Sequence, residues 1–216
     1  MFLDALGPED ADRLCSLGGP RRHGPGSALF HEREPGDRVL VLLTGRVKLV
    51  TVTPDGHEVV LAIREPGDLI GEMSALDGED RVATAIALEP VEVRAIPNAQ
   101  FTGYLERTPG AALALARLLC RRLRDADHKR AEHLATDTVG RVSARLVELA
   151  ERFGTETADG VRIDVPITQE ELAGWTGSSR EAVIRALRTL RELGLISTGR
   201  RSVTILDLGA LRERAG

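Results

Sequence analysis

The feature that most constrains the fold of this chain is a change of pattern near Pro109. Before it, from about Gly26 to Ile96, short runs of Val, Leu and Ile alternate with glycine turns at intervals of about ten residues. After it, residues 111–135 contain neither Pro nor Gly and are rich in Ala, Leu and Arg. Frequent turns between apolar runs are typical of a small barrel or a double-sheet jelly roll, and an uninterrupted Ala/Leu/Arg stretch is typical of one long helix. The pattern therefore predicts a β-rich first half followed by a long helix.

The β-rich part contains four runs that we expect to be strands. The pentapeptide Arg-Glu-Pro-Gly-Asp stands at residues 33–37 and again at residues 64–68, which suggests a roughly symmetric roll. We expect both copies to form the same turn, each leading into a strand. The four predicted strands are Val39–Leu43, Val47–Val52, Glu58–Ile63 and Val91–Ile96.

The predicted long helix carries an apolar seam whose members are three or four residues apart, a spacing typical of coiled coils. The same spacing continues to Arg130 and His133, so we expect the distal half of the seam to be weaker. A helix of this length extends beyond one small roll, so its seam needs a partner helix. We therefore expect a homodimer that forms through helix 111–135. The alternative is that the seam packs on its own β domain. The seam consists of Ala112, Leu115, Leu119, Leu123 and Ala126.

Composition excludes several classes of protein. The 216-residue chain is 42% apolar and 29% charged, which is ordinary for a globular protein and unlike a disordered or collagen-like chain. Two cysteines, Cys15 and Cys120, cannot build a disulfide scaffold or a four-thiolate cluster. The sequence contains no run of about 18 apolar residues, the length that a membrane span needs, and no secretory leader follows Met1. We therefore expect a cytoplasmic protein with no membrane partner.

The net charge of −4 is unevenly distributed along the chain. Residues 1–107 carry 11 basic and 18 acidic side chains, residues 108–154 carry 9 and 6, and residues 155–216 carry 9 and 9. The three segments therefore have net charges of −7, +3 and 0. The acidic average of the chain consequently does not exclude a local basic face that binds nucleic acid.

A helix-turn-helix is predicted in the last third of the chain. Thr168 is placed to cap a first helix, with Glu171 three residues later as the second half of a capping box. Gly177 ends this helix, and Ser178 or Ser179 caps the next one. The second helix has an apolar face formed by Ala182, Val183, Ala186, Leu187 and Leu190.

The opposite face of the second helix presents side chains suited to reading DNA. Arg180, Glu181 and Arg185 lie where a recognition helix meets base edges in the major groove. A guanidinium can donate hydrogen bonds to O6 and N7 of guanine at the same time, and a carboxylate can accept one from the amino group of cytosine. For Glu181 the alternative is a structural role, because Ser178 and Glu181 have the spacing of a capping box.

A hairpin expected at residues 195–206 has a basic tip, as in the wing of a winged helix that contacts phosphates. Helix, turn, helix and wing in this order predict double-stranded DNA as a partner. The candidate DNA-binding residues are Thr168, Ser179, Arg180, Glu181, Arg185, Arg200 and Arg201.

The chain resembles the cyclic AMP receptor protein (CRP/FNR) family of bacterial transcription regulators over nearly its whole length. One motif is Ile-Thr-Gln-Glu-Glu-Leu-Ala at 167–173 with Ser-Arg-Glu-Ala-Val-Ile-Arg at 179–185. It is similar to the family's helix-turn-helix signature and implies a TGTGA-like half-site of a palindromic operator. The second motif is Gly-Asp-Leu-Ile-Gly-Glu-Met-Ser-Ala-Leu at 67–76 with Arg-Val-Ala-Thr at 81–84. It resembles the family's phosphate-binding cassette and implies cyclic AMP as an allosteric effector. The resemblance also implies RNA polymerase as a partner and no enzymatic activity.

The cassette residues also have the chemistry that such a ligand needs. A cyclic phosphodiester carries one negative charge and is bound by a guanidinium and backbone N–H groups, and its ribose 2′-hydroxyl is bound by a carboxylate. Arg81 and Glu72 supply these two groups; the alternative is that they only pair with each other. The candidate effector-binding residues are Gly71, Glu72, Met73, Arg81, Val82, Ala83, Arg122, Ala126 and Asp127.

Three positions depart from the family's pattern. Val82 stands where cyclic AMP binders of the family have Ser or Thr, so one hydroxyl donor to the phosphate is missing while the backbone N–H remains. Ala126 and Asp127 replace the paired hydroxyl residues that meet adenine across the dimer. A carboxylate can accept from the amino group of adenine and equally from N1–H and N2–H of guanine. Cyclic GMP and constitutive activity are therefore alternatives to regulation by cyclic AMP.

We expect an α+β chain in three parts. They are a jelly-roll-like cyclic-nucleotide-binding β-roll at 1–107, a long dimerisation helix at 108–136 and a winged helix-turn-helix at 137–216. One competing class is a cupin-like metalloenzyme, but the histidines form no His-x-His pair, and we expect His57-Glu58 in the roll to belong to a turn, so no metal is expected. Another is a ligand-binding module that regulates a protein without contacting DNA.

Overall fold

The computed structural model describes residues 1–54, 56, 58–164, 167–199 and 202–216. Its contacts divide the chain into two compact units. The first comprises Met1–Val52 and Val60–Arg124, and the second comprises Thr53–Val59 and Asp125–Gly216. The boundary between the units falls inside the long helix and not at its end.

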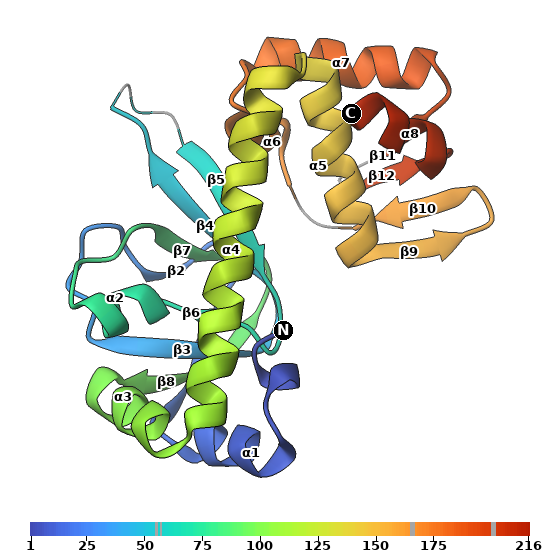
Figure 1. Ribbon diagram of the computed structural model, residues 1–216. Coiled ribbons are helices and arrows are strands. Elements are labelled where there is room, and N and C mark those ends of the chain that lie inside the picture. The colour runs from blue at the N-terminus through green and yellow to red at the C-terminus, as the bar shows by residue number, and fades with distance from the viewer. Residues whose placement is uncertain (55, 57, 165–166, 200–201) are drawn as a thin grey trace. The chain divides into compact units, whose positions relative to one another are not determined.

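The first unit is a β-roll (Figure 1). Its two four-stranded sheets have the strand orders β1-β8-β3-β6 and β2-β7-β4-β5, and the described pairings are antiparallel. The four predicted strands are confirmed and lie within β3, β4, β5 and β8. The sequence pattern does not predict the other four. The strands are β1 (Gly19–His23), β2 (Ala28–Phe30), β3 (Arg38–Thr44), β4 (Val47–Val52), β5 (Glu58–Arg64), β6 (Leu69–Ile70), β7 (Thr84–Ala87) and β8 (Val91–Pro97).

Strand β3 shows why the roll needs a continuous apolar run. Val39 and Val41 belong to a core cluster that includes residues of the helices. Leu40 and Leu42 belong to a second cluster with residues of both sheets, among them Val47. Successive side chains of a strand point to opposite faces, so β3 is covered on both of its faces.

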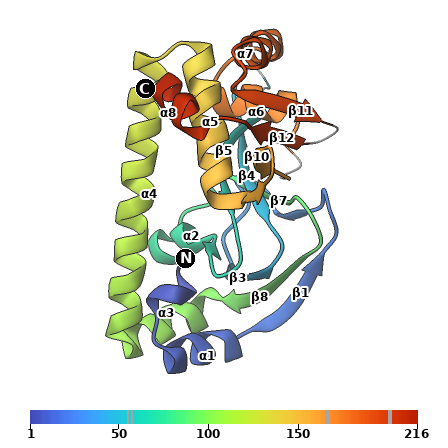
Figure 2. The same cartoon turned by 90° about the vertical axis from the view of Figure 1, so that its right-hand side faces the viewer.

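Helices cover one side of the roll. In both views α1 and α3 lie beside the first turns of α4 (Figures 1 and 2). Leu14 of α1 and Phe101 and Tyr104 of α3 join the same core cluster as the first half of α4. The helical elements of this part are η1 (Leu3–Ala5), α1 (Pro8–Ser16), α2 (Glu72–Asp77), α3 (Asn98–Arg107) and α4 (Pro109–Ala135).

Helix α4 confirms the predicted long helix but corrects the predicted seam. Leu115 is buried in the core of the roll, and Leu119 is partly buried against it. Ala112, Leu123 and Ala126 are exposed, and the Leu123 residue is 62% exposed. The seam is therefore not one continuous face, because the roll already covers the middle of it.

The repeated pentapeptide also needs correction. Both copies lead into a strand, β3 after residues 33–37 and β6 after residues 64–68. Gly67 has a φ of 89°, whereas the positive φ of the first copy is at Arg33, with 65°. Gly36 has a different role, because a Cβ atom there would collide with Ser74 of α2. The two copies therefore share their position before a strand and not their turn.

The second unit contains a four-stranded sheet with the order β11-β12-β10-β9, together with the predicted helix-turn-helix. Helix α8 packs on α5 (Figure 2) and is not predicted by the sequence pattern. The elements are α5 (Thr138–Phe153), β9 (Gly154–Thr157), β10 (Gly160–Ile163), α6 (Gln169–Thr176), α7 (Arg180–Glu192), β11 (Ile196–Gly199), β12 (Ser202–Ile205) and α8 (Leu208–Ala215).

Candidate functional site

Gly71, in the middle of the first cassette segment, directly precedes helix α2. Gly71 has a φ of 78°, in the left-handed region that favours glycine. A Cβ atom at this position would also collide with Nη1 of Arg81. Glycine therefore allows the Arg81 guanidinium to lie against the backbone that opens α2.

Arg81 is held in a buried position by backbone carbonyls. Its side chain is 2% exposed; Nη1 donates to the carbonyl of Gly71 at 2.8 Å, and Nη2 donates to the carbonyl of Arg38 at 2.6 Å. The guanidinium carbon lies 4.4 Å from the centre of the Phe30 ring. Burial lowers the pKa of Arg81, and the Asp37 carboxylate, 3.9 Å away, opposes that shift.

The third nitrogen of the Arg81 guanidinium, Nε, is buried and has no hydrogen-bond partner within the described residues. A buried donor without an acceptor is unfavourable, and an anionic oxygen is the acceptor that a guanidinium binds best. The site is therefore prepared for an anion.

Glu72, the first residue of α2, pairs with the long helix. The residue is 4% exposed, and Nη1 of Arg122 donates to its carboxylate at 2.6 Å. Nη2 of Arg122 donates to the carbonyl of Leu69 at 2.9 Å. The alternative in which Glu72 and Arg81 only pair with each other is wrong, because the buried partner of Glu72 is Arg122.

The repeated pentapeptide supplies an aspartate near each of the two arginines. Asp37 lies 3.9 Å from Arg81, and Asp68 lies 4.0 Å from Arg122. Neither these aspartates nor Phe30 are among the candidate residues predicted from the sequence. For the aspartates the repeat was the available signal, whereas no sequence pattern places Phe30 under the guanidinium.

The remaining candidate effector-binding residues are more scattered. Met73 and Val82 are exposed, and Ala83 is buried. Ala126 and Asp127 are exposed and lie in the part of α4 that belongs to the second unit. The structure thus assembles the cassette and Arg122 within the first unit, whereas the two distal residues belong to the second.

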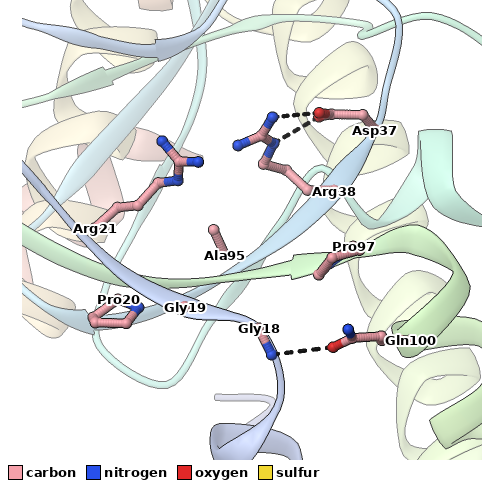
Figure 3. Close-up of a pocket in the computed structure, with 9 residues that line it drawn as sticks. All are labelled: Gly18, Gly19, Pro20, Arg21, Asp37, Arg38, Ala95, Pro97 and Gln100. Atoms are coloured by element: carbon pink, nitrogen blue, oxygen red, sulfur yellow. Dashed lines mark hydrogen bonds and ion pairs between the residues drawn. The ribbon is translucent and has the colours of Figure 1, made fainter.

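A pocket of the roll outside the cassette has a volume of about 580 Å³ (Figure 3). Nε of Arg38 donates to Asp37 at 2.7 Å, and the backbone N–H of Gly18 donates to Gln100 at 3.2 Å. The bond to Arg38 lowers the pKa of Asp37. No sequence motif predicts this pocket. It is lined by Gly18, Gly19, Pro20, Arg21, Asp37, Arg38, Ala95, Pro97 and Gln100.

In the second unit, the predicted capping box of the helix-turn-helix is confirmed. The backbone N–H of Glu171 donates to the Thr168 hydroxyl at 3.1 Å, and the backbone N–H of Thr168 donates to the Glu171 carboxylate at 2.7 Å. Gly177, with a φ of 56°, ends α6. The predicted glycine turn between the two helices is therefore present.

Ser179, and not Ser178, caps α7, because its hydroxyl accepts from the backbone N–H of Ala182 at 3.2 Å. The alternative, a capping box of Ser178 with Glu181, is therefore wrong. Glu181 still interacts with the helix N-terminus. Hydrogen bonds from its own backbone N–H and from the Ser179 hydroxyl lower its pKa.

The predicted reading face of α7 is exposed. Arg180, Glu181 and Arg185 all lie on the surface, and Nε of Arg180 is 3.9 Å from the carboxylate of Glu170 in α6. The apolar residues Val183, Ala186, Leu187 and Leu190 are buried on the other face. Arg200 and Arg201, the candidates at the wing tip, lie outside the described residues.

Comparison with known proteins agrees with this architecture. Residues 20–108 match the cyclic nucleotide-binding domain family, and residues 140–214 match the Crp-like helix-turn-helix domain family. The CRP-like cAMP-activated global transcriptional regulator of Mycobacterium tuberculosis is 36% identical over 190 residues, which cover 88% of this chain and 85% of that protein. The cyclic AMP receptor protein of Thermus thermophilus is 33% identical over 214 residues, which cover 99% and 96%. A solved CRP-family transcriptional regulator from Thermus thermophilus is 30% identical, with a TM-score of 0.76, and the match covers 90% of this chain and 96% of that one.

The chain belongs to the CRP/FNR family of transcription regulators. It combines a cyclic nucleotide-binding domain with a DNA-binding helix-turn-helix domain. The family consists of transcription regulators and not of enzymes, so the cupin-like alternative is wrong. His57, which that alternative would need, lies outside the described residues.

Two further observations concern only the part of the chain that the structure describes. No group of three or more His, Cys, Asp or Glu side chains there is arranged to hold a metal ion. None of the helices in that part combines the length and the apolar character needed to cross a bilayer.

Proposed function

We propose that this protein is a homodimeric regulator whose DNA binding responds to cyclic AMP bound in the β-roll. The observation that carries the proposal is the buried guanidinium of Arg81, with Nε unpartnered among the described residues, in the same cassette as the buried carboxylate of Glu72. Arg81 and the backbone N–H groups at the start of α2 bind the phosphate, and Glu72 binds the ribose 2′-hydroxyl. Two relatives are named for cyclic AMP, which supports this nucleotide as the effector.

The effector acts on α4 through Arg122. Because the carboxylate of Glu72 already binds Arg122, a ribose hydroxyl at Glu72 changes the surroundings of an arginine on the long helix. A ligand shifts a conformational equilibrium only when it binds one state better than the other. The Glu72–Arg122 pair supplies that difference. The mechanism needs the cassette and α4 to be in contact, as they are within the first unit.

Cyclic GMP is the second candidate effector, and Asp127 is the observation that favours it. Its carboxylate is exposed and can accept from N1–H and N2–H of guanine. Its Oδ1 lies 3.4 Å from Nη1 of Arg130. That pair offsets the repulsion that two such carboxylates would have across a dimer.

The dimer forms through the exposed face of α4. Leu113 is 52% exposed and Leu123 is 62% exposed, and Ala112, Ala116 and Ala126 are exposed on the same helix. Apolar side chains exposed along one long helix are typical of a surface that a second helix covers. A second copy of the chain is the partner that we propose.

The two copies bind a palindromic, TGTGA-like operator. Arg180, Glu181 and Arg185 read base edges, while Arg200 and Arg201 contact phosphates. Residues 1–107 are the sensor, 108–136 the dimerisation helix and 137–216 the DNA-binding domain in this proposal. The regulator acts in the cytoplasm with RNA polymerase.

The effector proposal is tested by calorimetric titration of the full chain with cyclic AMP and with cyclic GMP. We expect the wild type to bind cyclic AMP and Arg81→Ala to bind it about 100-fold more weakly, because the charge-assisted contact of the guanidinium with the phosphate is lost. Arg46→Ala is the matched control. It removes another partly buried arginine of the roll, one that pairs with Glu89 at 2.8 Å and lies outside the cassette.

The outcomes separate the alternatives. Binding of cyclic GMP alone would assign the effector to guanine, and loss of that binding in Asp127→Ala would locate the base contact. If neither nucleotide binds the wild type, the effector proposal is wrong. Equal losses in Arg81→Ala and Arg46→Ala would show that the effect comes from damage to the roll and not from a ligand contact.

A further inference from the structure

Arg141, in the first turn of α5, makes four hydrogen bonds that join two functional segments of the second unit. Nη1 donates to the carbonyl of Thr136 at 2.6 Å, and Nη2 lies 3.4 Å from the hydroxyl of Thr138. Nε donates to the carbonyl of Thr176 at 2.8 Å, and Nη2 donates to the hydroxyl of Ser178 at 3.1 Å. The first pair belongs to the junction of α4 and α5, called here the hinge (residues 136–138, of which Thr138 is the first residue of α5). The second pair belongs to the turn between α6 and α7.

The turn offers two acceptors to this side chain, and one of them, the Thr176 carbonyl, also accepts from the Ser178 hydroxyl at 3.3 Å. Thr176 is the last residue of α6, and the last carbonyls of a helix lack partners within it. Ser178 directly precedes Ser179, the N-cap of the recognition helix α7. The planar fork of a guanidinium can reach a carbonyl and a hydroxyl on two different segments, which the single ammonium of lysine cannot do in the same geometry.

The hinge is closely packed on its other side. The carboxylate of Asp137 accepts from the backbone N–H of Gly140 at 2.7 Å and from Nη2 of Arg214 in α8 at 2.9 Å. A Cβ atom at Gly140 would lie 3.1 Å from Cβ of Thr136 and 3.3 Å from the carbonyl oxygen of Arg214. A change in the hinge would therefore move the carbonyl to which Arg141 is bonded.

We propose that Arg141 is a positioning residue that fixes the recognition helix relative to the hinge and thereby sets sequence-specific DNA binding. It contacts neither effector nor bases; it acts through the turn that carries the N-cap of α7. The inference rests on the proposed reading of DNA by α7 and is independent of which nucleotide, if any, is the effector. It adds a role for a residue that no DNA-binding motif selects.

The experiment uses full-length wild type, Arg141→Ala, Arg141→Lys and the control Arg212→Ala. Arg212 pairs α8 with Glu151 of α5 at 2.8 Å, so the control also removes an arginine that ties α5 to another segment, but one that contacts neither hinge nor turn. An operator is first selected by the wild type from random duplexes. The affinity of each protein is then measured for that operator and for a random duplex at one salt concentration.

We expect the operator-to-random affinity ratio of Arg141→Ala to fall about 10-fold, which corresponds to one charge-assisted hydrogen bond at the lower end of its range. Affinity for the random duplex should stay within about 2-fold, because phosphate contacts do not depend on the exact placement of α7. Arg141→Lys should give an intermediate ratio, and Arg212→Ala should keep the wild-type ratio. A loss of folded protein would lower both affinities together and leave their ratio unchanged.

An unchanged ratio in folded Arg141→Ala would overturn the inference. If that variant does not fold, Arg141→Lys decides: a wild-type ratio overturns the inference, and a lowered ratio supports it. A lowered ratio in Arg212→Ala would also overturn it, because any loosened contact of α5 would then suffice. Failure of the proposed function looks different, because the wild type itself would then select no operator.

Discussion

The ion pair between Glu72 and Arg122 gives the most direct test of how the cassette is held on the long helix. In Arg122→Ala the Glu72 carboxylate, in a residue that is 4% exposed, stays buried without the cation that lies 2.6 Å away. Removing one partner of a buried pair costs about 3 to 5 kcal/mol. The Arg122 side chain is 17% exposed, so water reaches one end of the pair, and we expect a loss near the lower limit, about 3 kcal/mol.

Two natural probes allow this loss to be assigned to the first unit. Tyr104 is the only tyrosine and lies in the core of the roll, whereas Trp175 is the only tryptophan and lies in the second unit. Urea unfolding followed by tyrosine near-ultraviolet circular dichroism should shift its midpoint down by about 1 to 2 M in Arg122→Ala. The transition followed by Trp175 fluorescence should not shift.

Arg121→Ala is the control, because Arg121 is an exposed neighbour on the same helix. Its free energy of unfolding should stay within about 0.5 kcal/mol of the wild-type value. Adding Glu72→Gln to Arg122→Ala should recover most of the loss, because the buried charge is gone. A loss below about 1 kcal/mol in Arg122→Ala, or no recovery in the double variant, would refute the view that Glu72 is held as a buried charge by Arg122.

Two other expectations concern α4 and the hinge. Leu123→Asp changes a 62% exposed side chain, so the fold should remain, but sedimentation should show monomers where the wild type forms dimers; a dimeric variant would contradict the proposed interface. The backbone N–H of Gly140, and then Arg214, lower the pKa of Asp137, so its contribution to stability is present above the ordinary aspartate pKa and is lost as pH falls through the lower, folded-state value. Asp137→Asn should therefore lower the stability of the second unit, followed by Trp175 fluorescence, at neutral pH. It should also reduce the loss of that stability as the pH falls. The same loss at low pH in wild type and variant would contradict a stabilising role of the Asp137 carboxylate as the N-cap of α5.

Elements that depend on neighbouring residues could be predicted from the sequence. The Thr168 capping box lies within four residues, and β3 is a continuous apolar run, so both have local signals. Strand β1 (Gly19–His23) has none, because its residues are Gly, Pro, Arg and His. It is a strand because each of its residues pairs with β8, more than 60 positions away. The pattern of neighbouring residues does not indicate a partner strand so far away in the sequence.

The candidate site divides in the same way. Arg81 and Glu72 could be selected by the chemistry that a cyclic phosphodiester requires. The partner of Glu72 could not, because Arg122 is 50 residues away and reaches it only when α4 packs on the roll. The mistaken capping box at Ser178 has a similar cause, since its hydroxyl accepts from Arg141, 37 residues away.

Residue types and short-range spacing thus decided the kinds of element, the order of the domains and the classes of ligand that this chain can bind. The packed structure alone decided which partners the buried and half-buried charges meet: Arg81 with the carbonyls of Gly71 and Arg38, Glu72 with Arg122, and Arg141 with both the hinge and the turn. The physical reason is that a buried charge must be paired or hydrogen-bonded by whatever group the fold brings within about 3 Å. For distant residues, that group is determined by the path of the chain and not by the pattern around either residue.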